Sequence, residues 1–289
     1  MTEARCAMRA MLIYLFPALL RLEREKQDFE KYMPVFLAVM ALCYFAYHLL
    51  VQKDVYWMAA LIAIQKALIL NFTYLLMLEL SPDSKNIYWW SIALIALSLF
   101  LATNEPMLAT LFFLFNTRVL TKSSGYLTTR WELFLMTLFV GLLFVFSPFV
   151  YPLLFGVTLL MDYYYKHKDA RNLPFAIFGI LLSGLWFKNG FGIMTKQLDP
   201  LGSFLVFAIS LLYIFRLSIL KHILSFNDTK TNIISPKRVK SAGILLLISL
   251  MILAIGNGEL YEFLHLWIML ACISLPYLRD MSKLFLQGE

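Results

Sequence analysis

Long apolar runs separated by short polar segments cover almost the whole chain. The clearest runs are residues 34–51, 56–79, 173–187, 202–220, 242–256 and 261–277, with a marginal run at residues 7–20. A helix that crosses the hydrocarbon core of a bilayer needs about 20 apolar residues, within a range of roughly 17–25. The pattern therefore predicts an all-α protein, built as a polytopic bundle of transmembrane helices.

Two further apolar stretches are too long for one ordinary span and carry a polar break. Residues 88–117 are interrupted by Asn104, Glu105 and Pro106, and residues 133–161 are interrupted at Ser147-Pro148. Proline removes a backbone donor and moves the residue before it away from helical geometry. Each stretch is therefore either one kinked helix or two short helices that form a hairpin.

The distribution of basic residues favours the hairpins. Loops on the cytoplasmic side of multi-pass proteins carry an excess of Lys and Arg. Most of these residues lie in five segments, residues 21–33, 80–87, 118–132, 162–172 and 216–241. A single crossing by residues 133–161 would move the first three segments to the outer side. We therefore expect about ten spans plus an N-terminal helix, with the C-terminus in the cytoplasm.

The polar segments indicate how the chain is organised around these spans. We expect a single integral membrane domain over residues 1–289. Residues 7–20 resemble the apolar part of a signal peptide, but no cleavage site follows them, so residues 1–33 should form an anchor or interfacial helix and a cytoplasmic amphipathic helix. Residues 223–241 have the polar punctuation of a flexible cytoplasmic connector.

Composition agrees with a membrane protein and excludes several other classes. The chain is 61% hydrophobic and 15% charged, whereas soluble domains are roughly 45–50% apolar and about 25% charged. A soluble enzyme, a secreted disulfide scaffold and a disordered tail are therefore excluded. The net charge of +7 follows from basic cytoplasmic loops, so the lipid bilayer is the expected partner and nucleic acid is not.

A few polar residues are candidates for chemistry. Lys66 lies in the middle of a predicted span, together with Asn71, and a charge there costs roughly 2.5–3.5 kcal/mol. These two residues either form an intramembrane functional site or make structural contacts with a neighbouring helix. Glu105, in the first break, is either a general base or metal ligand at the membrane face, or part of a solvated turn.

Basic residues on two neighbouring inner loops form a second group of candidates. Arg118, Arg130 and Arg171 are suited to phosphate or anionic lipid headgroups. They also satisfy the positive-inside rule with no ligand at all, so both interpretations stay open. The three cysteines are far apart and form no C-x-x-C pair, so no metal site is predicted.

The stretch from Asn104 to Phe187 resembles a known family. It has Asn-Glu-Pro at residue 104, Asn-Thr-Arg at residue 116, Ser-Pro at residue 147 and Leu-Pro-Phe at residue 173. In this order the motifs resemble an uncharacterised family of multi-pass inner-membrane proteins of Gram-negative bacteria, classed as a domain of unknown function. The resemblance implies a location in the bacterial inner membrane and supplies no reaction.

A second resemblance is architectural. Strings of short helices with polar outer turns are similar to the membrane glycosyltransferases that use polyprenyl-phosphate sugars. Those enzymes carry an acidic residue in a long first outer loop, and here the corresponding turn, residues 52–55, is short and supplies Asp54. The resemblance implies that Asp54 or Glu105 is the catalytic or metal-binding acid. A divalent metal is expected only in that case, and no other cofactor is expected.

Three functions remain open at this point. The first is a role in cell-envelope biogenesis, with glycosyltransferase-like architecture and a lipid-linked substrate. The second is a non-catalytic membrane subunit of a larger envelope or secretion complex, because the spans hold few of the convergent polar groups that a catalytic cavity needs. The third is a transporter whose path is lined by Lys66 and Asn71. The sequence leaves open whether the chain is an enzyme at all.

Overall fold

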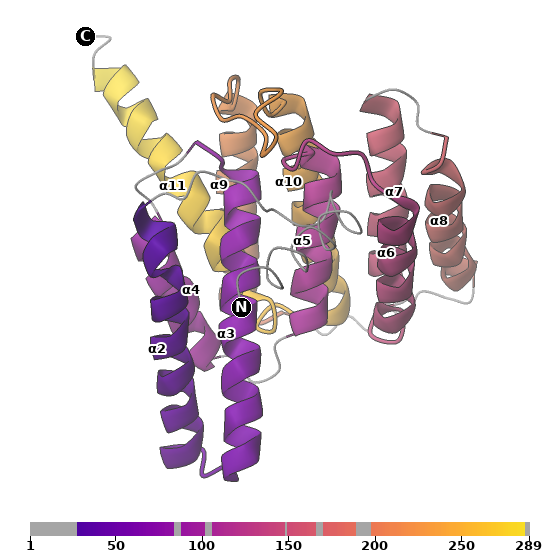
Figure 1. Ribbon diagram of the computed structural model, residues 1–289. Coiled ribbons are helices and arrows are strands. Elements are labelled where there is room, and N and C mark those ends of the chain that lie inside the picture. Colours follow the sequence, from indigo (N-terminus) through magenta and orange to yellow (C-terminus); the bar gives the residue numbers. More distant parts are fainter. Residues whose placement is uncertain are drawn as a thin grey trace, which may run out of the picture. The chain divides into compact units, whose positions relative to one another are not determined.

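The fold is helical throughout the part of the chain that the computed structural model describes, which is residues 28–83, 88–101, 106–147, 149–165, 170–188 and 198–286 (Figure 1). The helices are α2 (Asp28–Leu50), α3 (Tyr56–Leu80), α4 (Tyr88–Leu101), α5 (Met107–Thr121), α6 (Arg130–Leu143), α7 (Val150–Tyr165), α8 (Leu173–Lys188), α9 (Pro200–Ile219), α10 (Pro236–Ile252), the π-helical turn η1 (Leu253–Asn257) and α11 (Leu264–Leu286). These residues include no β-strand, only an isolated bridge between Phe226 and Ile233. The predicted all-α class is confirmed.

Several helices have the length and composition of membrane spans. Within the described residues, four are long and apolar enough to cross a bilayer, Tyr32–Leu50, Tyr56–Leu80, Pro200–Ile219 and Pro236–Asn257. Four shorter apolar helices accompany them, Trp89–Phe100, Met107–Thr121, Leu173–Leu185 and Leu264–Tyr277. Large apolar side chains such as Trp57, Leu185 and Leu211 are exposed on them, which suits contact with lipid. The total of about ten spans stays a prediction.

The structure describes the predicted break in the second of the two long apolar stretches. In the first stretch, α4 ends at Leu101 and α5 begins at Met107. In the second stretch, α6 ends at Leu143 and α7 begins at Val150, and the two helices pack against each other. The second stretch is therefore two short helices, as predicted. Residues 102–105, where the first stretch is expected to break, lie outside the described residues.

The chain forms two compact units, which we describe separately. Unit 1 contains Phe112–Lys196 and Leu220–Asn257, and unit 2 contains Glu25–Leu111, Gln197–Ile219 and Gly258–Glu289. Helix α5 begins in unit 2 and continues into unit 1 at Phe112. Residues 1–27, which include the expected N-terminal anchor, lie outside the described residues. The single integral membrane domain stays a prediction.

Unit 2 is built around the hairpin of α2 and α3. Helix α4 packs against both α3 and α11, and α9 packs against α11. Helix α3 has 25 residues and α4 has 14, so α4 covers only part of the length of α3. Figure 1 shows the α2–α3 hairpin extending past the end of α4. One end of α4 therefore lies alongside the middle of α3.

In unit 1, the closest packing joins α7 and α8. A Cβ atom built on Gly156 of α7 would lie 2.8 Å from the carbonyl oxygen of Ala176, and one built on Gly179 of α8 would lie 2.8 Å from the carbonyl oxygen of Pro152. The two backbones therefore touch directly at these glycines. Small residues allow this approach between membrane helices, where dispersion contacts replace the hydrophobic effect as the driving force.

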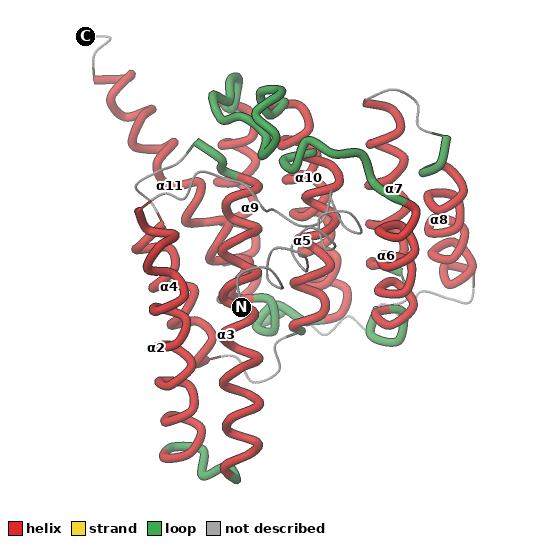
Figure 2. The backbone as a smooth tube through the Cα atoms, viewed as in Figure 1, coloured by secondary structure: helices red, strands yellow, loops and turns green. Residues whose placement is uncertain are grey.

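The loops of unit 1 gather at its two ends. Figure 2 shows the linker 122–129 and the loop 220–235 at one end, and the turn between α6 and α7 at the other. The loop is held by local bonds, because the side-chain oxygen of Asn227 accepts from the N–H groups of Thr231 and Asn232 and the N–H of Asp228 donates to the carbonyl of Ser123 at 2.8 Å. Within the expected connector, residues 223–241, helix α10 begins at Pro236, and the residues before it form a hydrogen-bonded loop.

The α7–α8 contact gives a direct test of this packing. We expect Gly179→Ala to lower the free energy of unfolding by about 1–3 kcal/mol, because the added methyl group overpacks the helix contact. The matched control is Gly184→Ala on the same helix, where no atom lies within 4 Å of the added methyl group. The control should keep or slightly raise stability. Thermal unfolding of both variants in the same detergent measures the difference, and equal midpoints would contradict the contact.

Candidate functional site

A buried carboxylate lies at the centre of a polar network in unit 1. Asp162, near the end of α7, is only 2% exposed. Its Oδ1 accepts a hydrogen bond from Arg238 Nη1 at 2.8 Å and lies 3.2 Å from Lys122 Nζ. Its Oδ2 accepts from Asn172 Nδ2 at 3.1 Å. Both oxygens of this carboxylate are therefore paired, as a buried charge requires.

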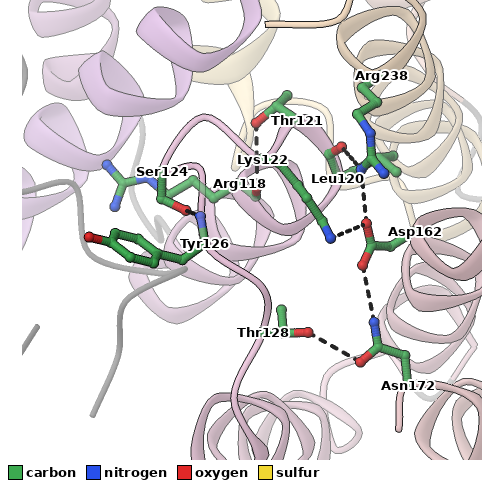
Figure 3. A network of polar contacts seen from close by, with 10 residues as sticks. All are labelled: Arg118, Leu120, Thr121, Lys122, Ser124, Tyr126, Thr128, Asp162, Asn172 and Arg238. Carbon is green, nitrogen blue, oxygen red and sulfur yellow. Dashed lines mark hydrogen bonds and ion pairs between the residues drawn. The ribbon is translucent and has the colours of Figure 1, made fainter. Parts of the chain in front are cut away.

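A second layer of contacts connects this carboxylate to the backbone (Figure 3). Thr128 donates to the side-chain oxygen of Asn172 at 3.1 Å, and Arg238 Nη1 also donates to the carbonyl of Leu120 at 2.9 Å. We call Lys122, Thr128, Asp162, Asn172 and Arg238 the Asp162 cluster. Its members come from the ends of α5 and α7, the residues before α6 and α8, and the start of α10. The cluster therefore joins five segments at one end of unit 1.

Local sequence signals place these side chains. Thr129 caps α6 in a capping box with Glu132, whose carboxylate accepts from the Thr129 N–H at 2.7 Å, and this fixes the residue before it, Thr128. Helix α10 begins with a proline at its first position after Ser235, a favourable start that puts Arg238 in its first turn. The cluster is thus assembled from residues at or next to helix termini.

The cluster contains more positive than negative charge. Lys122 and Arg238 both face the single carboxylate of Asp162. Arg238 is 6% exposed, and its Nη2 is buried with no hydrogen-bond partner among the described residues. The guanidinium lies over the ring of Tyr165, 5.4 Å from the ring centroid. The first turn of α10 adds a partial positive charge, so the Asp162 cluster itself is suited to an anion.

The three arginines predicted from the sequence are not members of the Asp162 cluster, and their role as a phosphate or headgroup site stays a prediction. Arg118 is buried at the end of α5, and Figure 3 shows its side chain directed away from Asp162. Arg130 and Arg171 are exposed. The basic residues that do come together are Lys122, which belongs to the same segment as Arg118 and Arg130, and Arg238, which belongs to the segment 216–241.

Neither acidic candidate is among the residues of the Asp162 cluster. Asp54 lies in the turn between α2 and α3, where its Oδ2 is 2.9 Å from His48 Nδ1 and its N–H donates to the His48 carbonyl at 3.1 Å. These contacts give Asp54 a structural role, because they close the turn between α2 and α3. Glu105 lies outside the described residues. The described part of the chain contains no group of three His, Cys, Asp or Glu residues placed to hold a metal.

Lys66 is buried in unit 2, as its position in the sequence suggests. Its ammonium group donates to the carbonyl of Leu99 and lies 5.9 Å from the ring centroid of Tyr44. Leu99 belongs to the last turn of α4, where carbonyls have no donor within the helix. Lys66 therefore caps α4. Asn71 is half-buried and lies about 140° further around α3, so these two residues point to different sides, and the contacts of Lys66 give no support to a shared transport path.

Sequence reasoning missed Asp162, Asn172 and Arg238. One signal was available, because Asp162 is an acidic residue at the end of an apolar run and is followed by a basic loop. The same pattern is equally typical of an ordinary span end that contains no buried cluster. The identity of its partners depends on contacts with a residue 76 positions away, which the local pattern does not contain.

Comparison with known proteins adds no relative. No protein family model matches the chain, and no curated protein or solved structure is significantly similar to it. The resemblances to the inner-membrane family and to the glycosyltransferases therefore stay predictions. The basis for a function is the geometry of the Asp162 cluster.

The central role of Asp162 can be tested by removing its charge. We expect Asp162→Asn to lower the free energy of unfolding by about 3–5 kcal/mol, because two buried cations lose their carboxylate. The matched control is Asp54→Asn, in the half-exposed pair with His48, where the loss should stay below about 1 kcal/mol. Chemical unfolding in one detergent compares the two. A smaller loss for Asp162→Asn than for Asp54→Asn would show that Asp162 does not organise the cluster.

Proposed function

We propose that this chain is a multi-pass protein of the bacterial inner membrane that handles a lipid-linked, phosphate-bearing substrate in cell-envelope biogenesis. The observation that carries the proposal is the Asp162 cluster, in which two cations face one buried carboxylate. The phosphate group of the substrate would be held by Lys122 and Arg238.

The chemistry of these two residues supports phosphate as the ligand. Guanidinium groups bind phosphate oxygens through charge-assisted hydrogen bonds, and Lys adds a mobile point charge. Arg238 has a donor nitrogen, Nη2, without a partner among the described residues, and Lys122 reaches the surface with 11% of its side chain exposed. A phosphate at this place would also lie near the start of α10, where the helix favours an anion.

The expected topology gives the side of the membrane from which the substrate comes. The linker 118–132 and the loop 162–172 belong to the segments that the positive-inside rule assigns to the cytoplasm. The Asp162 cluster joins these two segments, so the proposed site opens toward the inner leaflet. In a polyprenyl-phosphate glycosyltransferase, Asp54 and Glu105 would act on a sugar donor at the outer face of the membrane. The substrate proposed here comes from the inner leaflet instead.

Asp162 has a positioning role in this proposal. Both of its oxygens are engaged by Arg238, Lys122 and Asn172, so it holds the two cations at the site. Binding of the phosphate-bearing lipid is therefore the proposed activity, and any chemical step would use groups that the substrate or a partner protein supplies.

Lipid binding by the purified protein tests the proposal. We expect phosphatidic acid to bind about tenfold more tightly than phosphatidylcholine, and Lys122→Gln and Arg238→Gln each to reduce this preference about tenfold, since each removes a charge-assisted contact. Native mass spectrometry with both lipids measures the ratio.

The matched control is Arg130→Gln, which removes an exposed positive charge beside the same linker. This variant should keep the preference of the wild-type protein. If Arg130→Gln loses as much binding as Lys122→Gln, the preference comes from general surface charge and the proposed site is wrong. The thermal midpoint of each variant, measured in the same detergent, shows that the compared proteins are folded.

A further inference from the structure

A narrow cleft lies beside the Asp162 cluster in unit 1, between α5, α7 and α10. It is lined by Phe113, Asn116, Thr117, Leu120, Leu154, Thr158, Ala242, Leu245 and Leu246. Each of the three helices also supplies a contact of the cluster. Leu120 offers the carbonyl that Arg238 binds, Thr158 precedes Asp162 by four residues, and Ala242 follows Arg238 by four residues. The cleft is therefore about one helical turn, roughly 5.4 Å, deeper in the unit than the charged groups.

Two buried polar atoms in this cleft have no hydrogen-bond partner among the described residues. They are the side-chain oxygen of Asn116 and the hydroxyl of Thr158, on residues that are 3% and 1% exposed. The amide nitrogen of Asn116 already donates to the carbonyl of Phe112 at 2.8 Å, which leaves its oxygen as an acceptor. A threonine hydroxyl both donates and accepts. Together the two atoms match a ligand hydroxyl, which also donates and accepts.

We propose that the lipid phosphate held by Lys122 and Arg238 carries a free hydroxyl a few bonds from the phosphorus, and that Asn116 and Thr158 bind this hydroxyl. This inference rests on the proposed function and names its substrate class, a hydroxylated single-chain lipid phosphate such as a monoacylglycerol phosphate. The separation of one helical turn between the cluster and the cleft suits a phosphate and a hydroxyl on the adjoining carbons of a glycerol unit.

The size and the polarity of the cleft both favour this class. The cleft has about 10 Å³ of space, which is about the room that one water-sized group needs. It thus suits a single hydroxyl group and excludes an acyl chain. A polyprenyl phosphate has no polar group beyond its phosphate, so it would leave both Asn116 and Thr158 unpaired, which is unfavourable in a buried site.

Three synthetic lipids separate these classes in a binding experiment with the full-length protein. The probes are oleoyl lysophosphatidic acid, its analogue without the free hydroxyl, and farnesyl phosphate. We expect the wild-type protein to bind the first about tenfold more tightly than the other two, because only the first pairs both buried polar atoms. Native mass spectrometry in one detergent measures the three affinities.

Thr158→Val tests the residue assignment, because it removes the hydroxyl and keeps the shape. We expect this variant to lose the tenfold preference and to keep the affinity for the analogue without the hydroxyl. The matched control is Thr137→Val on α6, whose hydroxyl donates to the carbonyl of Leu133 at 2.7 Å and does not line the cleft. The control should retain the full preference.

The possible results distinguish this inference from the proposed function. If the wild-type protein binds all three phosphates equally and better than phosphatidylcholine, the hydroxyl site is wrong and the phosphate site stands. If none of the three binds better than phosphatidylcholine, both are wrong. If Thr158→Val lowers the thermal midpoint and keeps the preference, Thr158 is a structural residue and the inference is overturned.

Discussion

The structure depends on buried cations that bind the carbonyl groups at the ends of helices. The last carbonyls of a helix have no donor within the helix, and they carry its partial negative charge. In an apolar environment such groups must be satisfied by the protein itself. Three helices meet this requirement in the same way, since Arg216 binds the Leu80 carbonyl of α3 at 2.7 Å, Lys66 binds the Leu99 carbonyl of α4 and Arg238 binds the Leu120 carbonyl of α5.

Each of these cations also lies over a tyrosine ring, which reduces the cost of its burial. The ring is that of Tyr44 for Lys66, Tyr165 for Arg238, and both Tyr213 and Tyr277 for Arg216. Arg238 differs from a simple cap because it faces Asp162, which brings Lys122 and Asn172 to the same place. A helix cap thereby becomes a cluster in which two cations face one carboxylate, and the proposed phosphate site depends on this arrangement.

The sequence predicts the elements of this fold far better than it predicts their contacts. Proline and polar residues mark both breaks in the long apolar stretches, and the burial of Lys66 follows from its position within an apolar run. The partner of Lys66 lies 33 residues away and that of Arg238 lies 118 residues away, so neither follows from local spacing. Asn71 illustrates the same limit, because it shares a helix with Lys66 and points to another side of it. The candidate site could not be predicted, because an acidic residue at the end of an apolar run is equally typical of a simple span end and of a buried cluster. Asp162 therefore gives no local signal that separates the two.

The positive-inside rule explains basic residues near the ends of spans, but it does not explain why some of them are buried. Arg130 and Arg171 are exposed, and at such positions a basic residue fulfils the rule without loss of hydration. Lys122 and Arg238 also lie next to helix ends, but they are largely removed from water, and the positive-inside rule does not account for the free energy that this burial costs. The hydrogen bond to the helix carbonyl offsets part of the cost of burying Arg238, and the ion pairs with Asp162 offset part of this cost for both residues. Within the Asp162 cluster two cations face one carboxylate, and this arrangement is the basis of the proposed binding of an anionic ligand.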